Sequence, residues 1–122
     1  MNFKNANIYT EQFRFERGAF SVEDGKFCKV LGEEAPDAID LEGAYVIPGL
    51  IDVHTHGNSG ADFSDGDAAG VEKMAKYLAQ NGVTSFAPAS MTLPYETLEK
   101  AFASARAFVD ARPSDAAALR GI

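Results

Sequence analysis

The two histidines of the chain lie two residues apart, at His54 and His56. On a β-strand, side chains alternate between the faces, so both histidines would project from one face, together with Asp52. Two imidazoles held in this way can each direct a nitrogen at the same cation, and His-x-His on a strand is a metal-ligand geometry. The spacing alone leaves two interpretations open: a pair of metal ligands, or two histidines that are satisfied by hydrogen bonds without a metal.

Asp52 precedes the histidines on the same predicted face. Its carboxylate could orient a metal-bound histidine through a hydrogen bond. It could equally be a buried carboxylate that is bonded to the backbone. The sequence does not separate these two roles.

The segment that must position these side chains is a nearly continuous apolar run over residues 44–56, which is broken by Pro48-Gly49 before the strand begins. Residues 50–53 read as a strand that is buried on both faces, which is typical of parallel sheets. The carboxyl ends of parallel strands are where α/β proteins place their sites. The histidines follow this strand directly, so they are predicted to lie at that end.

Two helices are predicted after this strand. The first begins after Asp67 as N-cap, has apolar residues at positions 71, 74, 75 and 78, and ends at Asn81-Gly82. A short strand over residues 83–87 follows. The second helix is expected to have Thr92 as cap, Pro94 in its first turn and Pro113 at its end. Residues 119–122 resemble the opening of a third strand.

Before residue 48, short runs rich in aromatic and branched residues predict a small antiparallel sheet. These runs cover residues 7–9, 19–23, 26–31 and 38–41. Asp24-Gly25 separates two of them and is a typical hairpin turn, because both positions must accept a positive φ. We therefore expect two architectures in one chain.

The order strand, helix, strand, helix, strand predicts two βαβ units, which build either a doubly wound sheet or a (β/α)₈ barrel. A barrel takes about 250 residues, whereas this chain has 122. The fold is therefore either a small open sheet or part of a larger barrel.

Composition excludes several classes of function. With 11 basic and 18 acidic residues, the net charge of −7 argues against a nucleic-acid partner. No signal peptide or membrane-spanning run is visible, so we expect a cytoplasmic protein without a membrane partner. The single cysteine, Cys28, fits a reducing compartment, and we expect it to be an ordinary core residue.

Residues 46–56, VIPGLIDVHTH, resemble the signature that opens the barrel in the amidohydrolase superfamily. The small sheet before them is similar to the β-domain of many members. Residues 57–65, GNSGADFSD, resemble the Gly-rich loop of the N-acetylglucosamine-6-phosphate deacetylases, and residues 82–88 with Thr92 are similar to their second strand. Ala89 departs from the Pro-Thr pair that is usual there. The chain is thus identified as a member of the amidohydrolase superfamily, nearest to its deacetylases.

The resemblance implies an α/β fold: a small N-terminal antiparallel β-domain, whose N-terminal part is residues 1–47, followed by the first portion of a TIM-type (β/α)₈ barrel over residues 48–122. It further implies that His54 and His56 bind the more buried metal, with capacity for a two-metal site. Zinc is expected, although histidine and carboxylate ligands also suit Fe, Mn or Ni. The substrate would be a small amino-sugar phosphate, and the complete protein is expected to be a homodimer.

The implied reaction is metal-assisted hydrolysis of an acetamide in amino-sugar metabolism, giving glucosamine 6-phosphate and acetate. The family's remaining ligands, a Glu after the third strand, two later histidines and an Asp that is the general base, do not occur in this chain. We therefore assign no catalytic or phosphate-binding residue here and expect the isolated chain to be inactive. Two alternatives are a cyclic-amide hydrolase resembling dihydroorotases and hydantoinases, and a non-catalytic fragment. Asp62 and Asp65 are expected to be turn residues, and Phe63 a core residue.

Overall fold

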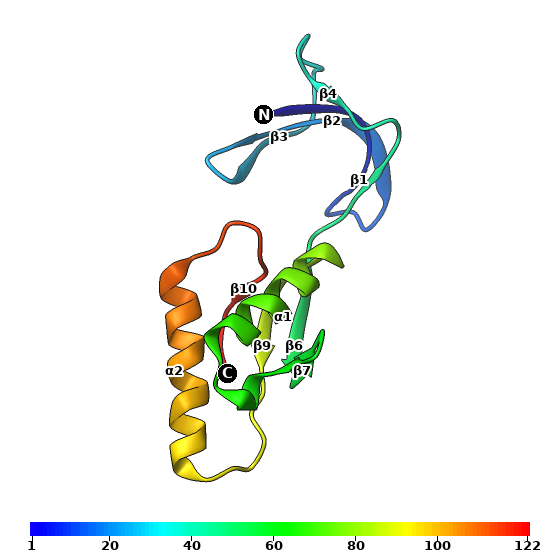
Figure 1. Ribbon diagram of the computed structural model, residues 1–122. Helices are drawn as coiled ribbons and strands as arrows, with labels where there is room; N and C mark the ends of the chain where they lie inside the picture. Colours follow the sequence, from blue (N-terminus) through cyan, green and yellow to red (C-terminus); the bar gives the residue numbers. More distant parts are fainter. The chain divides into compact units, whose positions relative to one another are not determined.

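The computed structural model describes residues 1–122, and the chain forms two compact units, Met1–Pro48 and Gly49–Ile122 (Figure 1). Each unit has a hydrophobic cluster of its own. In the first it is built on Ala6, Ile8 and Phe20. In the second it is larger and includes two fully buried aromatic side chains, Phe63 and Phe86.

The first unit is built on three antiparallel strands, β1 (Asn2–Tyr9), β2 (Phe15–Glu23) and β3 (Lys26–Gly32). They lie in the order β3-β2-β1. The turn between β2 and β3 has positive φ at both Asp24 and Gly25, at 50° and 72°. This confirms the hairpin that the Asp-Gly pair predicts, although β1 and β2 begin earlier than the apolar runs indicated.

Two short strands, β4 (Ile39–Asp40) and β5 (Tyr45–Val46), complete the sheet and pair with β1 in parallel. The sequence predicted only antiparallel pairing here. The difference arises because the chain returns from β3 and runs along the free edge of β1 in the same direction as β1. Two-residue strands carry too little periodicity to reveal such a pairing.

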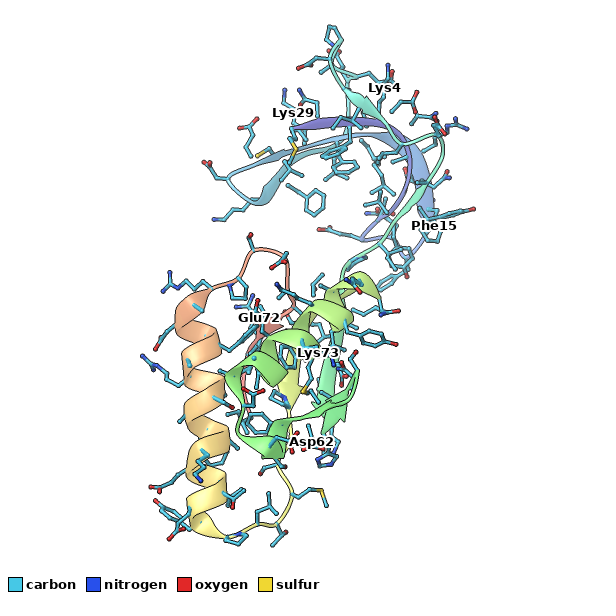
Figure 2. The ribbon with its side chains drawn as sticks, viewed as in Figure 1. Lys4, Phe15, Lys29, Asp62, Glu72 and Lys73 are labelled. Carbon is cyan, nitrogen blue, oxygen red and sulfur yellow. The ribbon has the colours of Figure 1, made fainter.

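Cys28 is exposed, and the prediction of a core cysteine is wrong. Every residue of β3 is exposed within the chain, including Lys29, which Figure 2 labels in this strand. The strand lies at the edge of its sheet, beside β2 only. Apolar neighbours in the sequence therefore do not imply burial at this position.

The second unit alternates strands and helices. These elements are β6 (Leu50–Thr55), α1 (Ala68–Gln80), β9 (Val83–Pro88), α2 (Tyr95–Ala111) and β10 (Ala118–Leu119). The strands form one parallel sheet in the order β10-β9-β6 (Figure 1). Both predicted βαβ units are therefore present, and the third strand lies parallel to β9 as expected. It covers Ala118–Leu119 and not the predicted residues 119–122, because residues 120–122 lie outside the strand and are exposed.

Helix α1 has the boundaries that its end signals predict. The Asp67 carboxylate accepts hydrogen bonds from the backbone N–H groups of Ala69 and Gly70, both at 3.1 Å, which satisfies two donors of the first turn. On its outer face, Lys76 forms ion pairs with Glu72 at 2.8 Å and Asp115 at 3.2 Å. The hydrogen bond from Lys76 to Glu72, and then that to Asp115, raise the pKa of the Lys76 ammonium above its usual value.

Helix α2 begins later than predicted. Its N-cap is Pro94, with extended ψ of 146° and no side-chain cap, so Thr92 is not the cap and Pro94 is not inside the first turn. The residue before a proline is disfavoured in the α conformation, so Leu93 cannot continue a helix that starts at Thr92. The helix ends at Ala111, and its C-cap Arg112 is in the left-handed region immediately before Pro113.

Strand β6 is exposed on both faces within the chain, which contradicts the prediction of a strand buried on both faces. Ile51 and Val53 are 69% and 78% exposed. The cause is that β6 pairs with β9 alone and that neither helix packs extensively over its faces. Neither helix has the length and apolar character that a membrane crossing requires.

Candidate metal centre

The histidine pair lies at the carboxyl end of β6. His54 belongs to this strand and His56 follows its last residue, Thr55. Their ring centres are 5.0 Å apart, with the ring planes at 89°. His54 is exposed and His56 is half-buried. The structure therefore brings together the two residues that the sequence singled out, as neighbouring side chains with accessible rings.

His56 is held by hydrogen bonds at both its ring and its backbone. The ring Nδ1 lies 2.8 Å from the backbone oxygen of Ala89, the residue after β9. The His56 carbonyl accepts a hydrogen bond from the backbone N–H of Phe63, also at 2.8 Å. Because Phe63 is fully buried in the core, this second bond ties His56 to the best-packed part of the unit.

His54 is held only at its backbone. Its N–H donates to Oδ1 of Asp52 at 3.1 Å, and its ring has no hydrogen bond. Asp52 thus takes the second of its two predicted roles, as a carboxylate bonded to the backbone, but it is half-buried rather than buried. It does not orient an imidazole in this structure.

The loop after His56 is more ordered than a plain surface loop. Strands β7 (Gly57–Asn58) and β8 (Ala61–Asp62) form a small hairpin, with Ser59 and Gly60 at positive φ in its turn. The 3₁₀ helix η1 (Phe63–Asp65) follows. The Ser-Gly pair is a turn signal, but Gly, Asn, Ala and Asp on either side of it are poor strand formers, so the sequence does not predict this hairpin.

Asp62 and Asp65 are expected from the sequence to be turn residues, and the structure shows that they cap the short helix η1. Asp62, labelled in Figure 2, accepts a hydrogen bond from the Ser64 N–H at 2.8 Å, and Asp65 accepts one from the Asp62 N–H at 3.2 Å. This reciprocal arrangement is a capping box. Both carboxylates are therefore engaged in shaping the loop, and Phe63 is the core residue that the sequence predicted.

Chemically, the pair can supply two nitrogen ligands. With metal–nitrogen bonds of about 2.1 Å, two imidazoles that share a tetrahedral cation have ring centres roughly 5 Å apart, which agrees with the separation here. No group of three or more His, Cys, Asp or Glu side chains gathers in the chain. The residues present thus fit part of a metal site, two of the three or four protein ligands that a catalytic zinc normally has.

Sequence reasoning missed the contribution of Ala89. Its backbone oxygen is the polar group that contacts the His56 ring. A side-chain pattern cannot reveal it, because every residue has a backbone carbonyl. Only the pairing of β6 with β9, which places Thr55 opposite Pro88, brings this carbonyl to the histidine.

Comparison with known proteins agrees with this geometry. A family model described as "Amidohydrolase family" matches residues 37–120. The N-acetylglucosamine-6-phosphate deacetylase of Bacillus subtilis is 30% identical over 116 residues, which cover 91% of this chain and 29% of that protein. The crystal structure of N-acetylglucosamine-6-phosphate deacetylase from Pasteurella multocida matches with a TM-score of 0.82 at 29% identity, over 98% of this chain and 33% of that chain.

A shorter stretch of the chain is similar to an enzyme that is named for a different reaction. An adenine deaminase of Lactobacillus delbrueckii is 43% identical over 58 residues, which cover 43% of this chain and 10% of that protein. The chain therefore spans about a third or less of the length of the proteins it matches. The fold is that of a small β-unit followed by the opening strands and helices of an amidohydrolase barrel.

Proposed function

Because the chain belongs to the amidohydrolase family, we propose that it forms part of a metal-dependent enzyme that deacetylates N-acetylglucosamine 6-phosphate to glucosamine 6-phosphate and acetate. The observation that carries this proposal is the pair of accessible imidazoles at the carboxyl end of β6, in a chain that matches deacetylases over nearly its whole length. Residues 1–47 would belong to the β-domain and residues 48–122 to the barrel of that enzyme.

In this proposal, His54 and His56 hold a divalent cation at the end of the sheet. Zinc is the first choice, and Fe, Mn or Ni also suit histidine ligands. The cation would activate water and polarise the acetamide carbonyl. The part of this chain is to bind and orient: His56 is fixed through its ring and backbone, and the His54 ring is free to adjust. No residue here is assigned to proton transfer or to the phosphate.

The substrate assignment also bears on location and assembly. A phosphorylated amino sugar is a metabolic intermediate of the cell interior, which fits a cytoplasmic enzyme. A homodimer is proposed for the complete protein. Neither nucleic acid nor membrane is proposed as a partner, in keeping with the net charge of −7.

The test replaces both histidines with alanine in the complete enzyme that carries this chain. We expect bound zinc and turnover of N-acetylglucosamine 6-phosphate to fall together, because two ligands of one cation are lost. Thr55→Ala is the matched control, since this residue lies between the histidines but projects from the opposite face of β6. Unchanged metal content in the double variant would show that the pair is structural.

Adenine deamination is a second candidate, favoured by the 43% identity to an adenine deaminase over 58 residues. Cyclic-amide hydrolysis is a third. Assaying the complete enzyme with the amino-sugar phosphate, adenine and dihydroorotate separates them, because each product differs. Preference for adenine or for the cyclic amide would contradict the proposed deacetylase. Turnover by the isolated 122-residue chain would also contradict it, because the site as proposed lacks ligands and a general base in this chain.

A further inference from the structure

We propose that the backbone of Ala89 is a positioning group that fixes the His56 ring as its Nδ1–H tautomer, so that Nε2 is the atom presented to a cation. The identity of that cation rests on the proposed function, but the tautomer does not. The inference concerns hydrogen bonds that exist in the metal-free chain and can be measured there.

The hydrogen-bonding capacity of the Ala89 carbonyl identifies the tautomer of His56. A backbone carbonyl oxygen can only accept a hydrogen bond, so at 2.8 Å from Ala89 O the His56 Nδ1 must be the donor and must carry the proton. In a neutral imidazole, the other nitrogen then has a free lone pair. Nε2 of His56 is thus the only ring atom available as a metal ligand.

The carbonyl of Ala89 is itself held in place. Ala89 follows directly after β9, and its N–H donates to the Thr55 carbonyl of β6 at 2.8 Å. The residue therefore bonds to β6 twice, through its N–H to the backbone at Thr55 and through its carbonyl to the adjacent ring at His56. We call these two hydrogen bonds the Ala89 clamp.

The clamp distinguishes the two histidines. With its own carbonyl bonded to Phe63, His56 is fixed on both sides, whereas the His54 ring has no partner. A ligand oriented by a second hydrogen bond binds metal more strongly, and loss of such a bond typically lowers metal affinity about 10- to 100-fold. His56 is therefore the preoriented ligand, and His54 is the one that adjusts to the cation.

The decisive measurement is the tautomer, read from ¹⁵N shifts of the imidazoles in the metal-free 122-residue chain at about pH 9. The chain has only two histidines, and the His54→Ala variant assigns them. We expect Nδ1 of His56 to give the signal of a protonated nitrogen, while His54 shows the average of a free ring. A His56 ring protonated at Nε2, or averaged like His54, would overturn the proposal.

A matched pair of variants provides a second test that needs no tautomer assignment. In His56→Asn, the carboxamide nitrogen takes roughly the place of Nδ1 and keeps a donor for Ala89, whereas His56→Ala removes it. We expect the urea midpoint of His56→Asn to remain near that of the parent and that of His56→Ala to fall. Equal losses in the two variants would overturn the clamp.

Zinc titration separates this inference from the proposed function. If zinc binds, the His56 signal that moves should be that of Nε2, and movement at Nδ1 instead would overturn the inference. A chain with the Nδ1–H tautomer but no response of either ring to zinc would support the clamp, and the metal site is then tested by the zinc content of the complete enzyme.

Discussion

Asn58 has a polar side chain whose buried atoms make no hydrogen bond. It lies two positions after His56, and both polar atoms of its side chain are buried without a hydrogen-bond partner. Such a group loses its hydration without replacement, which costs roughly 1–3 kcal/mol. The Gly-rich loop therefore contains a local energetic penalty next to the candidate metal centre.

Replacing Asn58 with leucine, of similar size, should remove this penalty. We expect the free energy of unfolding to stay level or to rise by up to about 2 kcal/mol, measured by urea denaturation. Asn81→Leu is the control in the same unit, because the Asn81 amide donates to the Tyr77 carbonyl at 2.8 Å. Stability lost equally in both variants would mean that Asn58 has a partner, such as a bound water.

For single residues, the sequence predicts the roles of several side chains but not the role of a backbone group. The pair His54 and His56, the N-cap Asp67 and the buried Phe63 follow from residue type and spacing, whereas for Asp62 the sequence indicates only a turn residue. Cys28 was misjudged because the burial of a strand residue depends on what covers the strand. The role of Ala89 cannot be predicted from the sequence, because it depends on a backbone carbonyl group, which every residue has.

Among the elements, the first turn of helix α1 is stabilised by one side chain, that of Asp67. Asp67→Ala would leave the N–H groups of Ala69 and Gly70 without their acceptors. The expected loss is about 1 kcal/mol of stability, with faster amide exchange in the first turn of the helix. Asp67→Asn keeps an oxygen acceptor and should retain most of the stability. No difference between the two variants would argue against the cap.

Strand β4 provides a pH-dependent prediction. The backbone N–H of Glu42, and then the amide of Asn5, donate to Asp40, and these hydrogen bonds hold the pKa of its carboxyl below the usual 3.8. A lowered pKa in the folded chain means that the unfolded chain binds the proton more readily. The stability that Asp40 contributes is therefore present above pH 3.8 and is lost as the pH falls through its folded pKa.

The measurement compares the parent chain with Asp40→Asn across this pH range. The parent should be the more stable of the two at neutral pH, and the difference should shrink as the solution is acidified below pH 3.8. A difference that stays constant with pH would show that the charge of Asp40 is not responsible.

The elements themselves were predictable to different degrees. The helix α1 and the Asp24-Gly25 hairpin follow from strong local signals. The start of α2 was missed because the restriction that Pro94 places on Leu93 outweighs the capping preference of Thr92. The parallel strands β4 and β5 were missed because their pairing with β1 is set by the path of the chain and not by a local pattern.

At the scale of the whole chain, the exposed strand β6 predicts association between copies of the chain in solution. Ile51 and Val53 project from one face of this edge strand and are largely exposed. Exposed apolar strands at the edge of a sheet favour pairing with other chains. We expect the 122-residue chain to self-associate, with a sedimentation coefficient that rises with protein concentration.

Replacing both Ile51 and Val53 with threonine keeps the β-branched shape and adds hydroxyl groups, so it should shift the chain toward monomer. Met91→Thr changes an exposed apolar residue outside the strands and should leave association unchanged. A parent chain that is monomeric at all concentrations would contradict the prediction.

The order of pairing in the β10-β9-β6 sheet also has a consequence for synthesis on the ribosome. Each strand pairs with the parallel strand made just before it, so the sheet can grow in the direction in which the chain emerges. Residues 50–89 contain β6, β9 and every hydrogen-bond partner of His56. Once residue 89 has left the exit tunnel, the nascent chain holds all the groups needed to orient that ring, before α2 has been translated.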